Sequence, residues 1–429
     1  MASNQVSRGK RPLGIYVHIP FCKSKCSYCN FCSYTISTQH VLDNYVNALL
    51  LQAEDFSVQC KNHYVNSIYI GGGTPTVLKP KQLIRIIDCI TKFYKVDRSM
   101  EITVEVNPAT VTVEDLKKLM KAGVNRLSIG MQSANNSELR DLGRIHTYEE
   151  FEKTYNAARF VGFENINVDV MYGIPGQTRE SFSKTLDKLI ALQPDHVSLY
   201  ALKIEEGTPL CKLKDKYVFP DDDTQCEMYL EAVKKLRKSY IYPYETSNFA
   251  CKDYESVHNL KYWFSDEYIG LGVAAHSYFN GERFGATKNL KTYIYAMTYV
   301  KKKIPIYVSY EEIGEKEAAK EYFLLNMRLY QGIDMDEFVK EFGREVAEMY
   351  LFPLKKYVKD GFVTIENDIY AFTEKGMMVS SYIKTEVLAE VDKKLEAVGE
   401  STDSKPNSTE KNDTAESDSG TDTDSYFFS

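Results

Sequence analysis

Three closely spaced cysteines carry the most specific chemistry in this sequence. Cys22, Cys26 and Cys29 form the pattern C-x3-C-x2-C, directly after a largely apolar run at 15–19. Three thiolates on one loop can bind three irons of a cubane [4Fe-4S] cluster, which leaves the fourth iron open to a small molecule. A structural zinc ion needs four closed ligands, usually from paired C-x2-C knuckles, and no second knuckle follows. The spacing therefore favours an iron–sulfur cluster over zinc.

The other cysteines indicate the compartment in which the protein works. The chain has nine cysteines, an odd number, and those beyond the motif are scattered, unlike the disulfide framework of a secreted protein. The N-terminal segment has no apolar signal-peptide core, and no apolar run approaches transmembrane length. We therefore expect a cytoplasmic protein that is not transmembrane. The net charge of −7 gives no support to nucleic-acid binding.

The elements that must position the cysteines alternate along the chain. After the run at 15–19, strands are predicted at 67–70, 101–106, 126–131, 166–171 and 197–202, and helices at 45–56, 81–94, 113–122, 148–161 and 181–192. This alternation predicts an α/β fold with a parallel sheet and crossover helices. The strand count fits a partial (β/α)6 barrel, although periodicity alone does not separate a barrel from a doubly wound sheet.

The unusual residues lie where these strands end, at a common edge of a parallel sheet. The cysteines follow the first strand, and glycines 71–73, Glu105, Gln132 and Asp169 end or follow later strands. In parallel barrels this carboxyl edge is where ligands bind. We therefore expect one ligand site that draws on several strands.

The remaining boundaries come from composition and periodicity. The predicted parts are a lead at 1–13, the barrel at 14–215, an extension at 216–305, a small winged-helix-like α+β domain at 306–385 and a tail at 391–429. In the α+β domain we expect Asp334 to cap a helix and a hairpin to turn at Asn367-Asp368. The segment 391–429 holds ten acidic residues against four lysines and predicts a disordered acidic tail.

The cysteine loop after a first strand resembles the radical S-adenosylmethionine (SAM) superfamily. Within it, the letters YVHIPFC and YCNF are similar to the group of oxygen-independent coproporphyrinogen III dehydrogenase and the HemW-like haem chaperones, over residues 13–376. The resemblance implies a partial radical SAM barrel, with the [4Fe-4S] cluster held by the three cysteines. It also implies that SAM chelates the open iron and is cleaved reductively to methionine and a 5′-deoxyadenosyl radical.

The same resemblance implies a set of SAM-binding residues. Gly72, Gly73 and Thr74, within GGGTP, match the segment that contacts the methionine part of SAM. Glu105 matches the residue that holds the ribose hydroxyls, which suits a carboxylate as a double acceptor. The other matching positions are Tyr16, Tyr28, Gln132, Arg144, Asp169 and Ala201.

Two features place the chain within the group. The dehydrogenases have a fourth cysteine where this chain has Phe31, and Cys32 departs from both patterns and is expected to bind no iron. The segment HNLKYW at 258–263 matches the HNxxYW motif of HemW-like proteins. Imidazole is a common axial ligand of haem iron, so His258 is the predicted haem ligand, with His276 and His196 next.

The predicted function is therefore that of a HemW-type haem chaperone. Its expected partners are haem, acceptor haemoproteins that include membrane-bound respiratory proteins, and an electron donor, at the inner face of the membrane. Two alternatives remain, an oxygen-independent coproporphyrinogen III dehydrogenase of porphyrin biosynthesis and a radical SAM enzyme with another substrate. The identity of position 31, the short N-terminus and the HNxxYW match favour the chaperone.

Overall fold

The computed structural model describes residues 10–35, 38–299 and 304–402. The chain divides into two compact units, residues 1–314 and 315–429. No helix of the described residues is long and apolar enough to cross a membrane.

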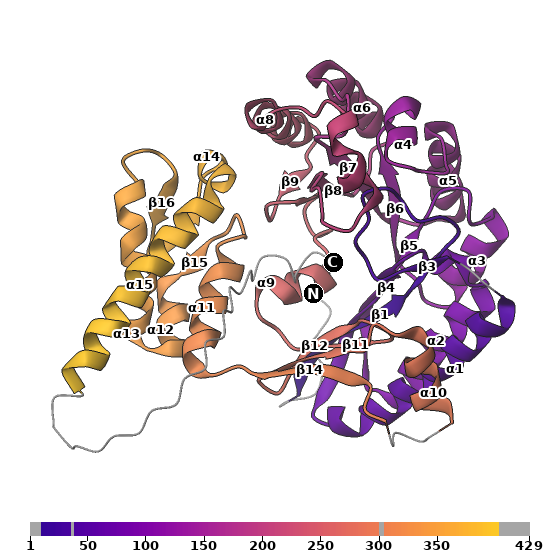
Figure 1. Ribbon diagram of the computed structural model, residues 1–429, viewed down its shortest axis with the longest axis horizontal. Coiled ribbons are helices and arrows are strands. Elements are labelled where there is room, and N and C mark those ends of the chain that lie inside the picture. Colours follow the sequence, from indigo (N-terminus) through magenta and orange to yellow (C-terminus); the bar gives the residue numbers. More distant parts are fainter. Residues whose placement is uncertain (1–9, 36–37, 300–303, 403–429) are drawn as a thin grey trace. The chain divides into compact units, whose positions relative to one another are not determined.

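The first unit is built on a sheet whose core is six parallel strands (Figure 1). These are β1 (Arg11–Ile19), β4 (His63–Gly72), β5 (Val96–Val106), β6 (Arg126–Gln132), β7 (Asn165–Tyr172) and β8 (His196–Ala201). Among these six strands, neighbours follow the order of the chain, without the reversal that defines a doubly wound fold. The predicted (β/α)6 architecture is therefore confirmed, and β1 begins at Arg11, inside the predicted lead.

Alternation along each strand gives the sheet two different faces. On β1, Leu13, Ile15 and Val17 are fully buried and point to one side, and the residues between them point to the other. The first side is apolar and is covered by helices. The second, called the inner face here, is polar, as shown by Asn167 on β7, whose Nδ2 donates to Ser128 Oγ on β6 at 2.8 Å.

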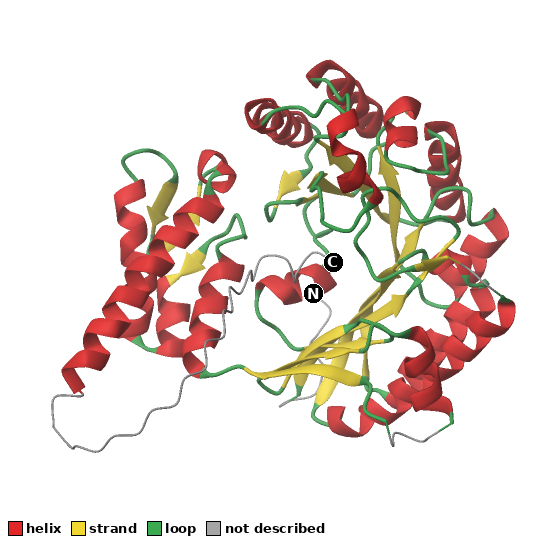
Figure 2. Ribbon diagram, in the orientation of Figure 1, coloured by secondary structure: helices red, strands yellow, loops and turns green. Residues whose placement is uncertain are grey.

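Helices cover the apolar face of the sheet (Figure 2). They are α1 (Gln39–Phe56), α2 (Pro80–Phe93), α3 (Val113–Lys121), α4 (Asn136–Asp141), α5 (Tyr148–Val161), α6 (Arg179–Ala191) and α8 (Asp222–Lys238). Thr112 and Asp115 form a capping box at α3, and Thr147 and Glu150 form another at α5. Each box satisfies backbone N–H groups that have no partner inside the helix.

Shorter strands extend the sheet at both ends. Beyond β8 lie β10 (Asn248–Ala250) and β9 (Tyr242–Pro243); beyond β1 lie β11 (Tyr268–Leu271), β12 (His276–Phe279), β13 (Glu282–Ala286) and β14 (Tyr307–Glu312). The predicted boundary at 306 is therefore misplaced, because β14 pairs with β13 and the first unit continues to Gly314.

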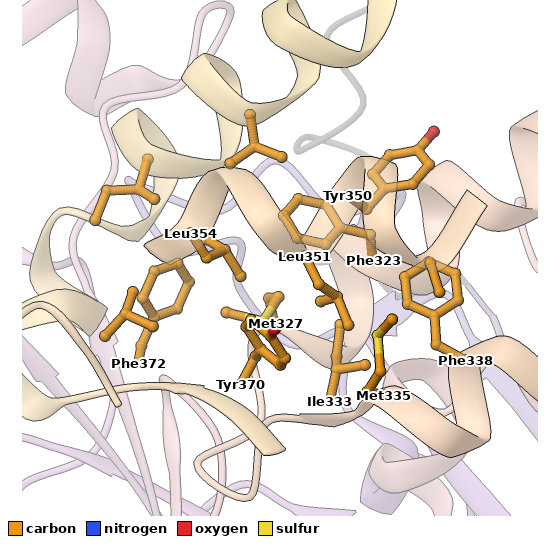
Figure 3. Packing of buried hydrophobic residues seen from close by; sticks show 14 of the residues in the cluster. Phe323, Met327, Ile333, Met335, Phe338, Tyr350, Leu351, Leu354, Tyr370 and Phe372 are labelled. Atoms are coloured by element: carbon orange, nitrogen blue, oxygen red, sulfur yellow. The ribbon is translucent and has the colours of Figure 1, made fainter. Parts of the chain in front are cut away.

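The second unit has its own apolar core (Figure 3). Its elements are α11 (Glu315–Asn326), β15 (Ile333–Asp334), α12 (Met335–Phe342), α13 (Arg344–Leu351), β16 (Val363–Glu366), β17 (Ile369–Phe372), α14 (Glu374–Met378) and α15 (Ser380–Thr402). As predicted, Asp334 caps α12, and β16 and β17 form a hairpin that turns through positive φ at Asn367 and Asp368. Figure 3 shows Phe323, Phe338 and Tyr350 from three helices packed together.

The predicted tail is wrong in its first part. Residues 391–402 belong to α15 and are helical rather than disordered. The reason is tertiary packing, since Val391 is 1% exposed within the core of this unit and Leu395 packs against it. The rest of the predicted tail, 403–429, lies outside the described residues.

A short helix, α9 (Val257–Trp263), lies against the inner face of the sheet (Figure 1). The Glu101 carboxylate on β5 accepts from the N–H groups of Val257 and His258, at 3.0 and 3.1 Å. A carboxylate at a helix N-terminus also stabilises the positive end of the helix dipole. Arg126 Nε on β6 lies 4.0 Å from Glu101 Oε2 and has no hydrogen-bond partner among the described residues.

We predict that Glu101→Gln destabilises the first unit by about 3 kcal/mol or more, because a buried guanidinium loses its counter-charge. Urea unfolding followed by tryptophan fluorescence measures this, since the single Trp of the chain, Trp263, lies in α9. Glu114→Gln is the matched control: it is exposed, its Lys117 partner is 4.0 Å away, and we expect a change below about 0.5 kcal/mol. Equal losses of stability in the two variants would contradict the role of Glu101 as the counter-charge of Arg126.

Candidate functional site

The predicted site residues gather along the carboxyl edge of the parallel strands. Gly72 lies at the end of β4, Glu105 near the end of β5, Gln132 at the end of β6, Asp169 on β7 and Ala201 at the end of β8. The register pairs neighbouring strands up to these positions. The glycine segment, the carboxylates and the cysteine loop therefore belong to one edge, as the strand order requires.

The cysteine loop is fastened to that edge at several points. Strand β2 (Phe21–Cys22) pairs with β3 (Tyr34–Thr35), which closes the loop on itself. In the middle of the loop, Ser27 N donates to the Leu142 carbonyl at 3.0 Å and the Ser27 carbonyl accepts from Leu210 N at 2.8 Å. Tyr28 packs on a small apolar cluster that includes Leu142 and Leu210. Tyr28 is thus a partly buried anchor of the cysteine loop.

The three thiols of the loop are of the type that binds a [4Fe-4S] cluster, in which each thiolate would bind one iron. Burial raises the pKa of Cys22, and it raises the pKa of Cys29 to about 11. The charges of neighbouring motif cysteines raise these two pKa values further. Metal coordination supplies the positive charge that makes such thiolates favourable. Among the described residues, no group of three or more His, Cys, Asp or Glu side chains is placed so that it could hold a single metal ion.

A chain of polar contacts joins two of these cysteines through the barrel. Arg144 Nη1 donates to Cys26 Sγ at 3.4 Å, and Arg144 Nη2 donates to Asn107 Oδ1 at 2.6 Å. Asn107 Nδ2 reaches Thr74 Oγ1 at 3.5 Å, and Thr74 Oγ1 donates to Cys22 Sγ at 3.8 Å. The sequence reasoning named Arg144 and Thr74 but missed Asn107. Its position directly after β5, where other strands carry site residues, was the available signal.

Close backbone approach explains two of the glycines. A Cβ on Gly73 would lie 2.8 Å from the Phe21 carbonyl oxygen, so only glycine lets the cysteine loop approach here. Gly72 has φ of +108°, and a Cβ there would meet the His18 ring at 2.4 Å. These residues bring the turn after β4 against the cysteine loop.

Glu105 is the central acceptor of the site. Its Oε1 accepts from the Tyr69 hydroxyl at 2.9 Å, and its Oε2 accepts from Gly72 N at 3.0 Å. Burial and the charge of Asp169 raise the pKa of Glu105 to about 7, against the effect of these two donors. Asp169 itself accepts from Ser128 and Asn167, and burial raises its pKa as well. The two carboxylates therefore lie close enough on the inner face for the charge of Asp169 to act on Glu105.

The remaining predicted contacts differ in exposure. Gln132 is 8% exposed and has φ of +64° at a register shift of β6. The shift places its amide nitrogen 2.9 Å from where a Cβ of Gly130 would lie. Ala201 is exposed at the end of β8. Tyr16 lies on β1 and donates to or accepts from His18 Nδ1 at 2.8 Å.

Cys32 lies apart from this arrangement. Its Sγ is 3.7 Å from the Lys288 carbonyl oxygen, and burial raises its pKa. None of the three motif cysteines contributes to that shift, whereas they do affect one another. That Cys32 binds no iron stays a prediction.

The histidine predicted to bind haem is not in a loop and is not accessible. His258 lies in α9, is 1% exposed, and has its Nδ1 2.9 Å from Ser67 Oγ and its Nε2 3.0 Å from the Tyr262 hydroxyl. Burial lowers its pKa to about 3. His196 is also fully buried, between Asn167 and Tyr244. His276 on β12 is partly exposed.

Comparison with known proteins first defines the class. The model of the radical SAM superfamily matches residues 16–189, and that of the HemN C-terminal domain matches 313–379. The solved structure of coproporphyrinogen III oxidase from Escherichia coli, described as a radical SAM enzyme, has a TM-score of 0.77 and 25% identity and covers 89% of this chain and 91% of its own. This chain is a radical SAM protein, which implies a [4Fe-4S] cluster and SAM.

Relatives at higher identity narrow the class. Heme chaperone HemW of Bacillus subtilis (strain 168) is 34% identical over 379 residues, which are 88% of this chain and 99% of the relative. Heme chaperone HemW of Escherichia coli (strain K12) is 31% identical over 384 residues, 88% of this chain and 99% of the relative. The chain belongs to the HemW family.

We predict that anaerobically reconstituted protein binds about four irons per chain and that Cys26→Ala loses the cluster, because one iron loses its thiolate. Iron analysis and visible absorption measure this. Cys32→Ala is the matched control, a cysteine six positions along the same segment that should leave the cluster intact. Stoichiometric zinc without charge-transfer absorption would contradict the cluster.

Proposed function

We propose that this protein binds haem and delivers it to acceptor haemoproteins, with a [4Fe-4S] cluster and SAM as its cofactors. Membership of the HemW family over nearly the whole length of its relatives carries the proposal. Haem is the molecule that is transferred. The acceptors include membrane-bound respiratory proteins, to which the protein delivers haem at the cytoplasmic face of the membrane. An electron donor is the further partner that a reducible cluster requires.

The residues of the carboxyl edge have distinct tasks in this proposal. Cys22, Cys26 and Cys29 hold the cluster, and Arg144 donates toward the sulfur of Cys26. Gly72–Thr74 offer backbone groups to the methionine part of SAM, and Glu105 accepts from its ribose hydroxyls. Bound together, the two cofactors supply reductive cleavage of a sulfonium carbon–sulfur bond. The protein binds, orients and excludes water, and no general acid or base is needed.

The exposure of the histidine side chains indicates which of them could bind haem iron. All seven histidines of the chain are described, and only His40 and His276 are not buried. His276 lies near Lys288, whose charge contributes to lowering the pKa of His276. The carbonyl of Lys288 also accepts from Tyr34 and faces Cys32 in the cysteine loop. We therefore propose His276, rather than His258, as the imidazole that meets haem iron.

The second candidate function is oxidative decarboxylation of coproporphyrinogen III. The fold similarity to coproporphyrinogen III oxidase of Escherichia coli favours it. Against it stands Phe31, which occupies the place of the fourth cysteine of those enzymes. The lower identity to that enzyme than to the HemW relatives points the same way.

For the SAM site, we predict that reduced protein forms 5′-deoxyadenosine and that Glu105→Ala weakens SAM binding by roughly 1.5–3 kcal/mol, the loss of hydrogen bonds to a charged acceptor. Equilibrium binding of SAM to the reconstituted protein gives the difference. Glu114→Ala, on the outer surface of α3, is the control. Unchanged affinity in Glu105→Ala would remove Glu105 from the site.

For the cargo, we predict that anaerobic titration with haem gives a defined stoichiometry and a Soret band that changes in His276→Ala, because the axial donor is lost. His40→Ala serves as control, since His40 is the other histidine that is not buried. A parallel incubation with coproporphyrinogen III and SAM should give no decarboxylation. Decarboxylation without haem binding would replace the chaperone with the second candidate.

A further inference from the structure

Tyr69 on β4 joins two groups that are far apart in the sequence. Its hydroxyl donates to Glu105 Oε1 at 2.9 Å. Its ring stacks on the imidazole of His258, with ring centroids 5.4 Å apart and planes at 28°. The tyrosine therefore bridges the acceptor of the proposed SAM site and the helix α9 on the inner face.

The imidazole at the other end of this bridge is held in one orientation. A neutral imidazole has one donor and one acceptor nitrogen, and His258 uses them on Ser67 at 2.9 Å and Tyr262 at 3.0 Å. Glu101 anchors the N-terminus of α9 to β5. Ser67 is two residues before Tyr69 on the same strand, so both point to the inner face. The stacking surface offered to Tyr69 is thus built by the HNLKYW helix.

We infer that Tyr69 is a positioning residue for Glu105, and that HNLKYW serves SAM binding through Tyr69 rather than haem iron through His258. This rests on the proposed function, in which Glu105 receives the ribose of SAM. An ionised carboxylate has about four lone-pair sites. Tyr69 and Gly72 occupy two of them, which leaves two for the ribose hydroxyls and sets the direction in which these point.

The charges around Glu105 decide how SAM binding depends on pH. The titratable and charged groups that interact with it are Tyr16, Tyr69, Arg126, Asp169, Tyr200 and Tyr262. Burial and Asp169 raise its pKa to about 7, and the Tyr69 hydroxyl opposes this rise. Only the ionised form accepts both hydroxyls fully, so affinity falls as pH falls through this pKa. Loss of the Tyr69 hydroxyl raises the pKa and moves the midpoint to higher pH.

The first test is Tyr69→Phe, which keeps the ring and removes the hydroxyl. SAM affinity of the reconstituted protein near neutral pH should fall about three- to tenfold, less than in Glu105→Ala, because Tyr69 acts only through Glu105. The midpoint of affinity against pH should rise, which general loosening of the fold would not produce. Tyr293→Phe is the matched control, because this buried tyrosine donates to Gln52 Oε1 at 2.6 Å outside the inner face. It should leave both quantities unchanged.

The second test concerns α9. His258→Asn, and the milder Ser67→Ala if the first variant does not fold, should lower SAM affinity in the same direction. Either change should add nothing to Tyr69→Phe, because both act through the same hydroxyl. The Soret band of haem-loaded protein should be unchanged in His258→Asn.

Each contrary result has a distinct meaning. A wild-type protein that binds no SAM overturns the proposed function and the inference together. A wild type that binds SAM, with an unchanged pH midpoint in Tyr69→Phe, overturns the inference alone. Full additivity of His258→Asn and Tyr69→Phe, or loss of the Soret band in His258→Asn, overturns the role given to α9.

Discussion

A barrel with a polar inner face has to satisfy every donor and acceptor that it removes from water, and most of the first unit follows from this requirement. Apolar residues fill the outer face beneath the helices, so the buried charges concentrate on the other side of the strands. Glu101, Arg126, Glu105 and Asp169 lie there on three adjacent strands. An unpaired charge at such a position costs several kcal/mol. The inner face is stable only as a network.

The network also links the inner face to the cysteine loop. Arg144 contacts Cys26, which lies 118 positions before it in the chain, and Asn107, which lies 37 positions before it. Thr74 continues the path to Cys22. The loop is therefore held by side chains of the barrel as well as by its own short pairing of β2 and β3. A frame of this kind suits a site where a [4Fe-4S] cluster and SAM must be held in one relative orientation.

The HNLKYW segment shows that a motif can identify a family while the surroundings of its residues come only from the structure. The motif match pointed to the HemW family, and relatives of that name confirm the family. The prediction of His258 as an axial ligand came from that motif match together with the chemistry of imidazole. In the structure the segment forms α9, and its histidine has a hydrogen-bond partner on each ring nitrogen. An imidazole is as good a buried bridge between two hydroxyls as it is a metal ligand, and only the surroundings separate these uses.

The sequence by itself determined the cysteine spacing, the alternation of strands and helices, and the residues at strand ends, because these depend on local periods and short intervals. Predicted helices such as 148–161 agree with α5 to the residue. Only the tertiary structure decided that Asn107 completes the link between cysteines, that α9 lies on the inner face, that β14 belongs to the first unit and that α15 runs on through 391–402. Each of these depends on contacts between distant segments or on burial against a core. Local pattern carries no information about such pairings, since it is the strand order and the packed core that bring the partners together.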